Sequence, residues 1–324
     1  MENTSGWMFT LRAYTHPFFT HDELFRDPDE GLRSNRERLL LAVLERMIHQ
    51  EAHPLANEER SVLRAAVQLT YDRVPDRTPI LTDFLEVLGT GPFEDADDVR
   101  HARNLWRQLR LWASGPAARL LNQPTSIRLT TGLAAFDLKG LDSDPHLKSV
   151  VMLILSGIVW NLVARDRRER KVVVFDECWK HLQTPAAAQL IAELYRTSRK
   201  YACSILTISQ SVDDFVSSPI APALTQNSHT VHLLRHQLGH DLVARTFRLN
   251  PREAHLFGSL EMRRGEYSEA LVLHGDHHFL ARIVLSPLEY WIATTHQPDL
   301  KLELTMRERH PRLSRLELLE LLGA

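Results

Sequence analysis

The chain has 324 residues, of which 44% are hydrophobic and 25% charged, a balance typical of a globular protein with one large domain or two modest ones. Its formal net charge of −2 excludes a global attraction to nucleic acid or anionic lipid, so any such contact must come from a local patch. The 2 cysteines exclude a disulfide framework and a cysteine-based zinc site, and they favour a reducing, cytoplasmic setting.

The N-terminal sequence is not typical of a signal peptide. "MENTSGWMFTLRAYTHPF" lacks the basic start and the apolar core that such peptides have. The longest apolar run, residues 150–160, is shorter than the roughly 20 residues that span a bilayer. We therefore expect a buried helix that begins at Asp144-Pro145, and no integral membrane segment.

Residues 34–122 have helical periodicity and follow a mixed N-terminal segment at 1–33. Four amphipathic stretches are predicted to be helices: 36–50, 56–73, 78–89 and 95–115. Gly89 is expected to end the third stretch and Gly115 the fourth. The region is therefore predicted to be an all-helical subdomain.

Residues 123–300 alternate between strand and helix patterns. Short strands are predicted at 126–131 and 133–141, either as a hairpin or separately, and longer ones at 171–176, 203–210 and 228–236. Helices are predicted at 144–166, 185–200 and 240–249, and a hairpin turns at His274-Gly275-Asp276. This alternation predicts an α/β core with a mainly parallel sheet, followed by a helical tail at 301–324.

Two acids follow the apolar strand in "KVVVFDECWKHL", residues 171–182. Ligands of open α/β sheets lie at the carboxyl ends of strands, where Asp176 and Glu177 emerge. Such a pair can hold Mg²⁺ through water and deprotonate an attacking water. Gln210 ends the next predicted strand and can touch a γ-phosphate there. The alternative is a pair of strands that end in solvated polar turns.

A cationic cluster lies between these two strands, in "ELYRTSRKYA". Arg196, Arg199 and Lys200 stand at a helix end, where cations complement the helix dipole. The second interpretation is an arginine finger, a guanidinium that reaches the phosphates bound by a neighbouring subunit.

Three segments occur in an order that resembles a known family: "KVVVFDECWKHL", "YRTSRKYACSILTISQSVDDF" and "LARIVLSPLEYWIATT". They are similar to the C-terminal motor domain of TraC-type conjugative ATPases, which are the cytoplasmic ATPases of type IV secretion systems in the RecA-like clan of HerA and FtsK. "SIRLTTGLAAFDLKGLDSDPHLKSVVMLIL" and the helical insertion before it are also similar, so the resemblance covers roughly residues 10–300.

The resemblance implies a RecA-like P-loop NTPase core with an all-helical insertion, and it implies roles for individual residues. Asp176 and Glu177 match the Walker B pair, as metal-binding residue and general base. Gln210 matches the sensor glutamine, and Arg199 the arginine finger. Arg264, next to Arg263 in "MRRGE", lies near the last motor motif and would contact the nucleotide.

The phosphate-binding loop of such motors, G-x-x-x-x-G-K-[ST], does not occur in this sequence. None of its 13 glycines is followed by lysine. We therefore expect a core that is incomplete at its N-terminus, with residues 1–33 as its remnant. We also expect a chain that alone binds and hydrolyses ATP poorly, and that uses ATP and Mg²⁺ only when the loop is supplied.

The family implies ATP turnover that powers pilus assembly or the transfer of DNA or protein. It also implies other type IV secretion subunits as partners, a hexameric ring, and a cytoplasmic location, including the periphery of the inner membrane. A catalytically silent scaffold subunit of a secretion complex is the alternative, and the missing loop favours it directly. The presence of Asp176, Glu177 and Gln210 argues against a long-silent subunit.

The sequence is also compatible with two other classes of function. A metal-dependent hydrolase would use His232, His236 and His240, at the spacing of one helix face, or the cluster Asp276, His277 and His278.

A DNA-binding module would use arginines on one face of the helix at 95–115, interleaved with Trp106 and Trp112. These arginines are Arg100, Arg103, Arg107 and Arg110. The more common arrangement has the aromatics in the core and the arginines paired with Asp95, Asp97 and Asp98.

Overall fold

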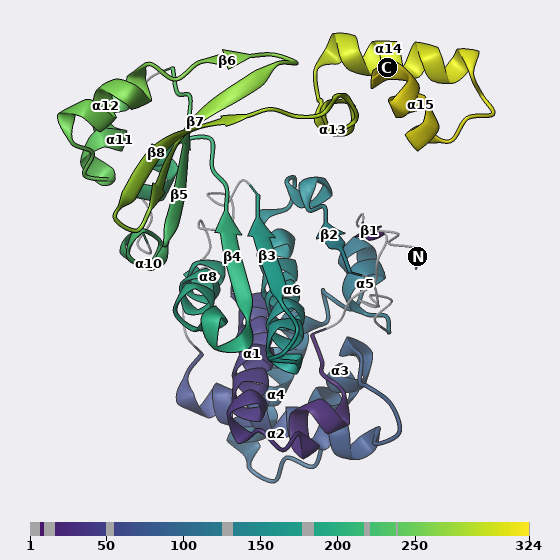
Figure 1. Cartoon of the computed structure of the whole chain (residues 1–324). Helices are drawn as coiled ribbons and strands as arrows, with labels where there is room; N and C mark the ends of the chain where they lie inside the picture. The colour runs from purple at the N-terminus through teal and green to yellow at the C-terminus, as the bar shows by residue number, and fades with distance from the viewer. Residues whose placement is uncertain are drawn as a thin grey trace. The chain divides into compact units, whose positions relative to one another are not determined.

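The structure is a computed structural model in which the chain divides into two compact units, Met1–Ile208 and Ser209–Ala324 (Figure 1). It describes residues 7–9, 17–49, 55–124, 132–176, 185–216, 221–237 and 239–323. Each unit has a hydrophobic core of its own.

Helices form the first part of the first unit, as predicted. They are a short π-helix η1 (Asp22–Arg26), α1 (Glu30–Ile48), α2 (Asn57–Arg73), α3 (Leu81–Thr90), α4 (Ala96–Leu109) and α5 (Gly115–Leu121). The helix α1 begins earlier than predicted because the Asp29 carboxylate accepts a hydrogen bond from the Leu32 amide. The helix α3 continues one residue beyond Gly89, to Thr90, and Gly91 follows as its C-cap.

The long apolar helix α6 (Pro145–Arg165) begins at the predicted cap. The Asp144 carboxylate accepts a hydrogen bond from the Leu147 amide at 3.0 Å, and Pro145 occupies the first turn. Part of α6 shares a core with α1–α4. The segment Pro145–Ala164 is long and apolar enough to cross a membrane, but 61% of its most apolar window is buried inside the protein. Its composition therefore fits the buried core helix that was predicted.

Parallel strand pairs complete the first unit. The strand β1 (Trp7–Phe9) pairs with β2 (Ala134–Phe136), and β3 (Lys171–Phe175) pairs with β4 (Cys203–Thr207). The predicted strand at 126–131 lies outside the described residues. A short 3-10 turn, η2 (Lys139–Leu141), precedes α6, while α8 (Pro185–Thr197) and the 3-10 turn η3 (Ser198–Tyr201) precede β4.

The second unit is built on an antiparallel sheet. Its strands are β5 (Thr230–Leu234), β6 (Met262–Arg263), β7 (Tyr267–His274) and β8 (His277–Ile283), and both β5 and β8 pair with β7. The predicted hairpin is confirmed: Gly275, at φ +56°, and Asp276 connect the paired His274 and His277.

The helices of the second unit lie before, between and after these strands in the sequence. They are α9 (Val212–Val216), α10 (Ala221–Asn227), α11 (His240–Thr246), α12 (Pro251–Gly258), α13 (Pro287–Ala293), α14 (Gln297–Arg309) and α15 (Arg315–Gly323). Phe257, Leu271 and Leu273 lie in the core between the sheet and α11 and α12.

Candidate functional site

Asp176 directly follows β3, at the carboxyl end of the β3–β4 pair. The register pairs Phe175 with Thr207, and the Ile208 amide donates a hydrogen bond of 2.9 Å to the Phe175 carbonyl. The two strands therefore end side by side, and the side chain of Asp176 is exposed at this edge. An exposed carboxylate at the end of a parallel strand is the type of ligand that Mg²⁺ prefers.

The neighbouring helix α8 is anchored to this end of β4. The Tyr195 hydroxyl and the Thr207 hydroxyl lie 2.7 Å apart, within hydrogen-bond distance. This contact fixes α8 against the last residue of β4 and so stabilises the strand end that lies beside Asp176. Tyr195 was not identified from the sequence, because a tyrosine in an amphipathic helix carries no signal of its partner.

Two of the predicted catalytic residues cannot be placed next to Asp176. Glu177 lies outside the described residues. Gln210 is exposed, and it belongs to the second unit, which begins at Ser209. Its predicted role stays a prediction.

Arg199 lies at the opposite end of the β3–β4 pair from Asp176. It is part of η3, which immediately precedes β4, and the Lys171 amide at the start of β3 bonds to the Ala202 carbonyl nearby. A five-residue strand is about 16 Å long, so Arg199 does not reach the Asp176 edge of its own chain. Arg199 is exposed, which is compatible with a contact to another subunit.

Arg264 is in the turn between β6 and β7 in the second unit and is exposed. The neighbouring Arg263 lies 4.0 Å from Glu266 and has its guanidinium over the Tyr267 ring. Neither arginine is placed in relation to the first unit, so their proximity to a nucleotide stays a prediction.

The strand face that carries Asp176 also carries exposed aliphatic side chains. Val172, Val174, Leu206 and Ile208 are all exposed, and Val174 pairs directly with Leu206 across the two strands. Strands in parallel sheets are normally buried on both faces. The uninterrupted apolar run "VVVF" is typical of a strand buried on both faces, so this face needs a cover that the described residues do not provide.

The helical metal-site interpretation of residues 232–240 is wrong. His232 lies in β5 and His240 begins α11, so the three histidines do not share a helix face. In the second cluster, His278 bonds to Glu253 at 2.8 Å. No group of three metal-binding side chains is found within the part of the chain that the structure describes.

The tryptophans of the predicted DNA-binding helix are not free to stack on bases. Trp112 is buried and its indole N–H donates to the Met47 carbonyl at 2.7 Å, while Arg110 covers the Trp106 ring. The core position predicted for the aromatics is therefore confirmed for Trp112. The predicted pairing with acids is found for Arg100, which lies 3.1 Å from Asp97.

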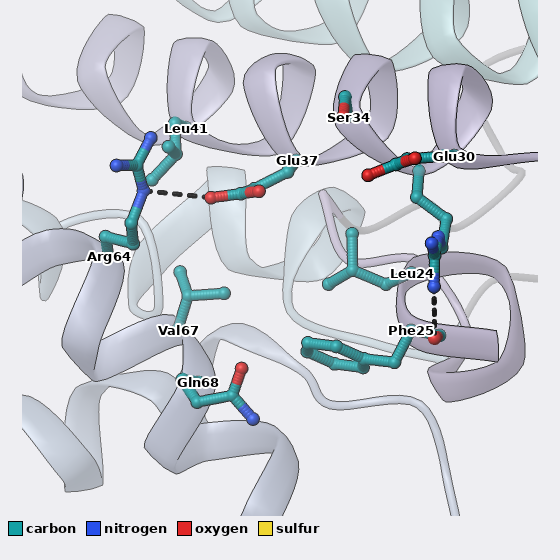
Figure 2. A pocket seen from close by; sticks show the side chains of 10 residues that line it. Leu24, Phe25, Glu30, Ser34, Glu37, Leu41, Arg64, Val67 and Gln68 are labelled. Carbon is teal, nitrogen blue, oxygen red and sulfur yellow. Dashed lines mark hydrogen bonds and ion pairs between the residues drawn. The ribbon is translucent and has the colours of Figure 1, made fainter.

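A cavity of about 330 Å³ lies between η1, α1 and α2 (Figure 2). Its floor is apolar, with Leu24, Leu41 and Val67. Three of the charged groups on its rim contact other groups of the protein: Arg64 pairs with Glu37 at 2.9 Å, and Arg33 donates to the Phe25 carbonyl. The residues that line the cavity do not include those at the ends of β3 and β4.

Comparison with solved structures shows the fold. The chain is similar to VirB4 of Thermoanaerobacter pseudethanolicus, with a TM-score of 0.69 and 22% identity, over 88% of this chain and 78% of that one. It is also similar to the bacterial conjugative coupling protein TrwB, with a TM-score of 0.51 and 12% identity, over 86% of this chain and 73% of that one. The predicted P-loop NTPase fold is confirmed.

Two curated relatives match shorter segments. TraC of Escherichia coli (strain K12) is 31% identical over 101 residues, which are 30% of this chain and 12% of TraC. The type IV secretion system protein CagE of Helicobacter pylori (strain ATCC 700392 / 26695) is 33% identical over 76 residues, or 24% of this chain and 8% of CagE. The matched segments are thus about a tenth of the length of these relatives.

Residues 14–311 match the TraG P-loop domain family, whose members bind nucleotide phosphates and Mg²⁺ as P-loop proteins do. The resemblance to conjugative and type IV secretion motor domains is therefore confirmed. The chain belongs to the TraG P-loop domain family.

Proposed function

We propose that this chain is the Walker B part of the motor domain of a type IV secretion or conjugation ATPase. The observation that carries the proposal is the position of Asp176, at the carboxyl end of a parallel strand in a chain that matches a P-loop family over residues 14–311. Asp176 holds Mg²⁺ through water, and Glu177 accepts the proton of the attacking water.

The phosphate-binding loop of this site comes from a segment outside the 324 residues, on the same or another polypeptide. Its backbone amides and lysine supply the phosphate cradle that this sequence lacks. Mg²⁺, when bound with ATP, neutralises charge on the phosphates. The exposed aliphatic face of β3 and β4 supports the proposal, because a strand–loop–helix segment would cover it.

We also propose that Gln210 is the γ-phosphate sensor and that Arg264 contacts the nucleotide, as the resemblance to the motor motifs implies. Arg199 acts in a neighbouring subunit of a ring, because it lies too far from Asp176 of its own chain. We propose a hexamer that works with other secretion subunits in the cytoplasm or at the inner membrane, with DNA among its contacts. We also propose that residues 34–122 form the helical subdomain of this motor and residues 123–300 its α/β core.

The second candidate is a silent scaffold subunit. The observation that favours it is the absence of any Gly-Lys pair from the sequence. A scaffold would keep its contacts to secretion subunits but would hydrolyse no ATP even when a loop-bearing polypeptide is present.

The test is phosphate release from Mg-ATP by the chain copurified with a polypeptide that carries G-x-x-x-x-G-K-[ST]. We expect activity in this complex, and a loss of 100-fold or more with Glu177→Gln, because general-base catalysis contributes roughly 10²–10⁴-fold. Glu169→Gln is the matched control, since Glu169 is an exposed acid before β3, and it should leave the rate unchanged. Equal rates in both variants would refute the role of Glu177, and an inactive complex would favour the scaffold.

A further inference from the structure

The cavity between η1, α1 and α2 has a recessed apolar floor. Leu24, Leu41 and Val67 form this floor, and each of them is at most 6% exposed. Close packing normally fills such a space with side chains. The volume of about 330 Å³ lies within the range of roughly 300–1,000 Å³ that small-molecule sites have. The cavity is therefore large enough for a small ligand with an apolar group.

One stripe of α1 supplies the polar side of the cavity. Glu30, Arg33, Ser34 and Glu37 all line it, and their spacing of i, i+3, i+4, i+7 places them on one face of the helix. Glu37 pairs with Arg64 of α2 at 2.9 Å. Figure 2 shows this ion pair on one side of the cavity and Glu30 on the other. Two charged groups, Glu30 and Arg33, remain to contact a ligand.

Glu30 and Arg33 have opposite charges but do not pair with each other. Among the described residues, the Glu30 carboxylate forms no hydrogen bond or ion pair. The Arg33 guanidinium donates to the Phe25 carbonyl at 3.1 Å, which orients it and leaves other N–H groups for a ligand. A carboxylate in the first turn of a helix also complements the helix dipole, so Glu30 alone indicates no ligand. Its combination with an oriented guanidinium and an apolar floor does.

We propose that this cavity binds a free α-amino acid with an apolar side chain. The ligand's ammonium group bonds to Glu30 and its carboxylate to Arg33, whose guanidinium fork suits carboxylate oxygens. The ligand's side chain packs on the apolar floor. A zwitterion fits better than a simple amine or carboxylic acid, because the four charged groups that line the cavity already sum to zero.

The inference is independent of the proposed ATPase activity. All 10 residues that line the cavity belong to η1, α1 and α2, in the first unit. A ligand that binds only the folded protein stabilises it by mass action. A bound amino acid should therefore also move the unfolding of the first unit to higher urea.

The test is isothermal titration calorimetry of the full chain with L-leucine and with analogues that each lack one of its groups. 4-Methylpentanoate lacks the ammonium group, 3-methylbutylamine lacks the carboxylate, and L-serine lacks the apolar group. We expect millimolar or tighter binding of L-leucine. Each analogue should bind about tenfold more weakly, because a hydrogen bond to a charged group, or a few buried methylenes, contributes about that factor.

The preference between ligands separates a direct contact from a general loss of structure, which would weaken all ligands alike. Glu30→Gln should abolish the preference for L-leucine over 4-methylpentanoate and keep the preference over 3-methylbutylamine. Arg33→Gln should do the reverse. Glu58→Gln is the matched control and should keep both preferences, since Glu58 is an exposed acid in the first turn of α2.

Three results would contradict this site. Absence of L-leucine binding at about 10 mM would overturn the proposal. Unchanged preferences in both variants would overturn it, because the ligand would then be bound elsewhere. Binding of 3-methylbutylamine as tight as that of L-leucine would overturn it in favour of a simple amine.

Discussion

At the scale of single residues, Arg36 connects three elements of the first unit. It is only 7% exposed, and its guanidinium donates to the Asn161 side chain in α6 at 2.8 Å. It also donates to the Asp27 carboxylate at 2.7 Å and to the Glu23 carbonyl at 2.6 Å. The bond from Arg36 holds the pKa of Asp27 below its usual value, with help from the Asp29 amide. A group with a lowered native pKa stabilises the fold when it is ionised.

We predict that Asp27→Asn lowers the free energy of unfolding by about 2 kcal/mol at pH 7, because a hydrogen bond to a charged group contributes roughly 1.5–3 kcal/mol. The ionised Asp27 stabilises the native state fully above its unfolded pKa of about 3.9, and this contribution disappears as the pH falls through the lower native pKa. The difference between wild type and variant should therefore be constant from pH 7 to 5 and shrink below about pH 4. Urea unfolding at each pH measures it.

Asp22→Asn is the control for this prediction. Asp22 pairs with Arg26 at 3.2 Å, but both side chains are more than 70% exposed, so this ion pair should contribute little. A variant of Asp27 that is as stable as the wild type at pH 7 would show that the Arg36 network does not depend on this carboxylate.

At the scale of elements, local chemistry made much of the fold predictable. The Asp144 cap, Pro145 and the apolar run after them predict α6, and Gly275-Asp276 predicts the β7–β8 hairpin. Pairing between distant segments was not predictable in the same way. The parallel partner of β2 is β1, at Trp7–Phe9, which has no strand pattern of its own.

The same distinction between local signals and pairing of distant segments applies to the candidate site. The position of Asp176 directly after β3 was predicted correctly, because an apolar run followed by an acid is a local signal. The spacing of His232, His236 and His240 was misleading, because a period of four residues also occurs by chance across a strand, a loop and a helix start. The position of Arg199 at the far end of the strands depends on the β3–β4 register, which the sequence does not state.

The exposed aliphatic face of β3 and β4 allows a prediction at this scale, which rests on the proposed function. Val174 and Leu206 are 51% and 45% exposed, so Val174→Lys/Leu206→Lys should change the stability of the isolated chain little. The same change should abolish copurification with the loop-bearing polypeptide and its ATPase, since lysines would be buried there without partners. Leu304→Lys, on an exposed position of α14, is the control. Full ATPase in the double variant would mean that this face stays uncovered in the active protein.

At the scale of the whole molecule, the two units have separate cores, and the core of the second unit is the smaller. Domains without a shared core do not unfold as one cooperative system. Trp291 is the only tryptophan in residues 209–324, and its indole N–H donates to the Leu322 carbonyl at 2.9 Å, between α13 and α15. Its fluorescence therefore reports on the helices α13 and α15 of the second unit.

We predict two urea transitions when unfolding is followed by tryptophan fluorescence, with the second unit unfolding first because it buries less apolar surface. Trp291→Phe should remove the fluorescence change of the first transition and leave its circular dichroism change. Asp27→Asn should move only the later transition to lower urea, since Asp27 and Arg36 belong to the first unit. A single transition, coincident by both probes and shifted as a whole by Asp27→Asn, would mean that the units are coupled in folding. A destabilising substitution near η1 would then lower the stability of both units together.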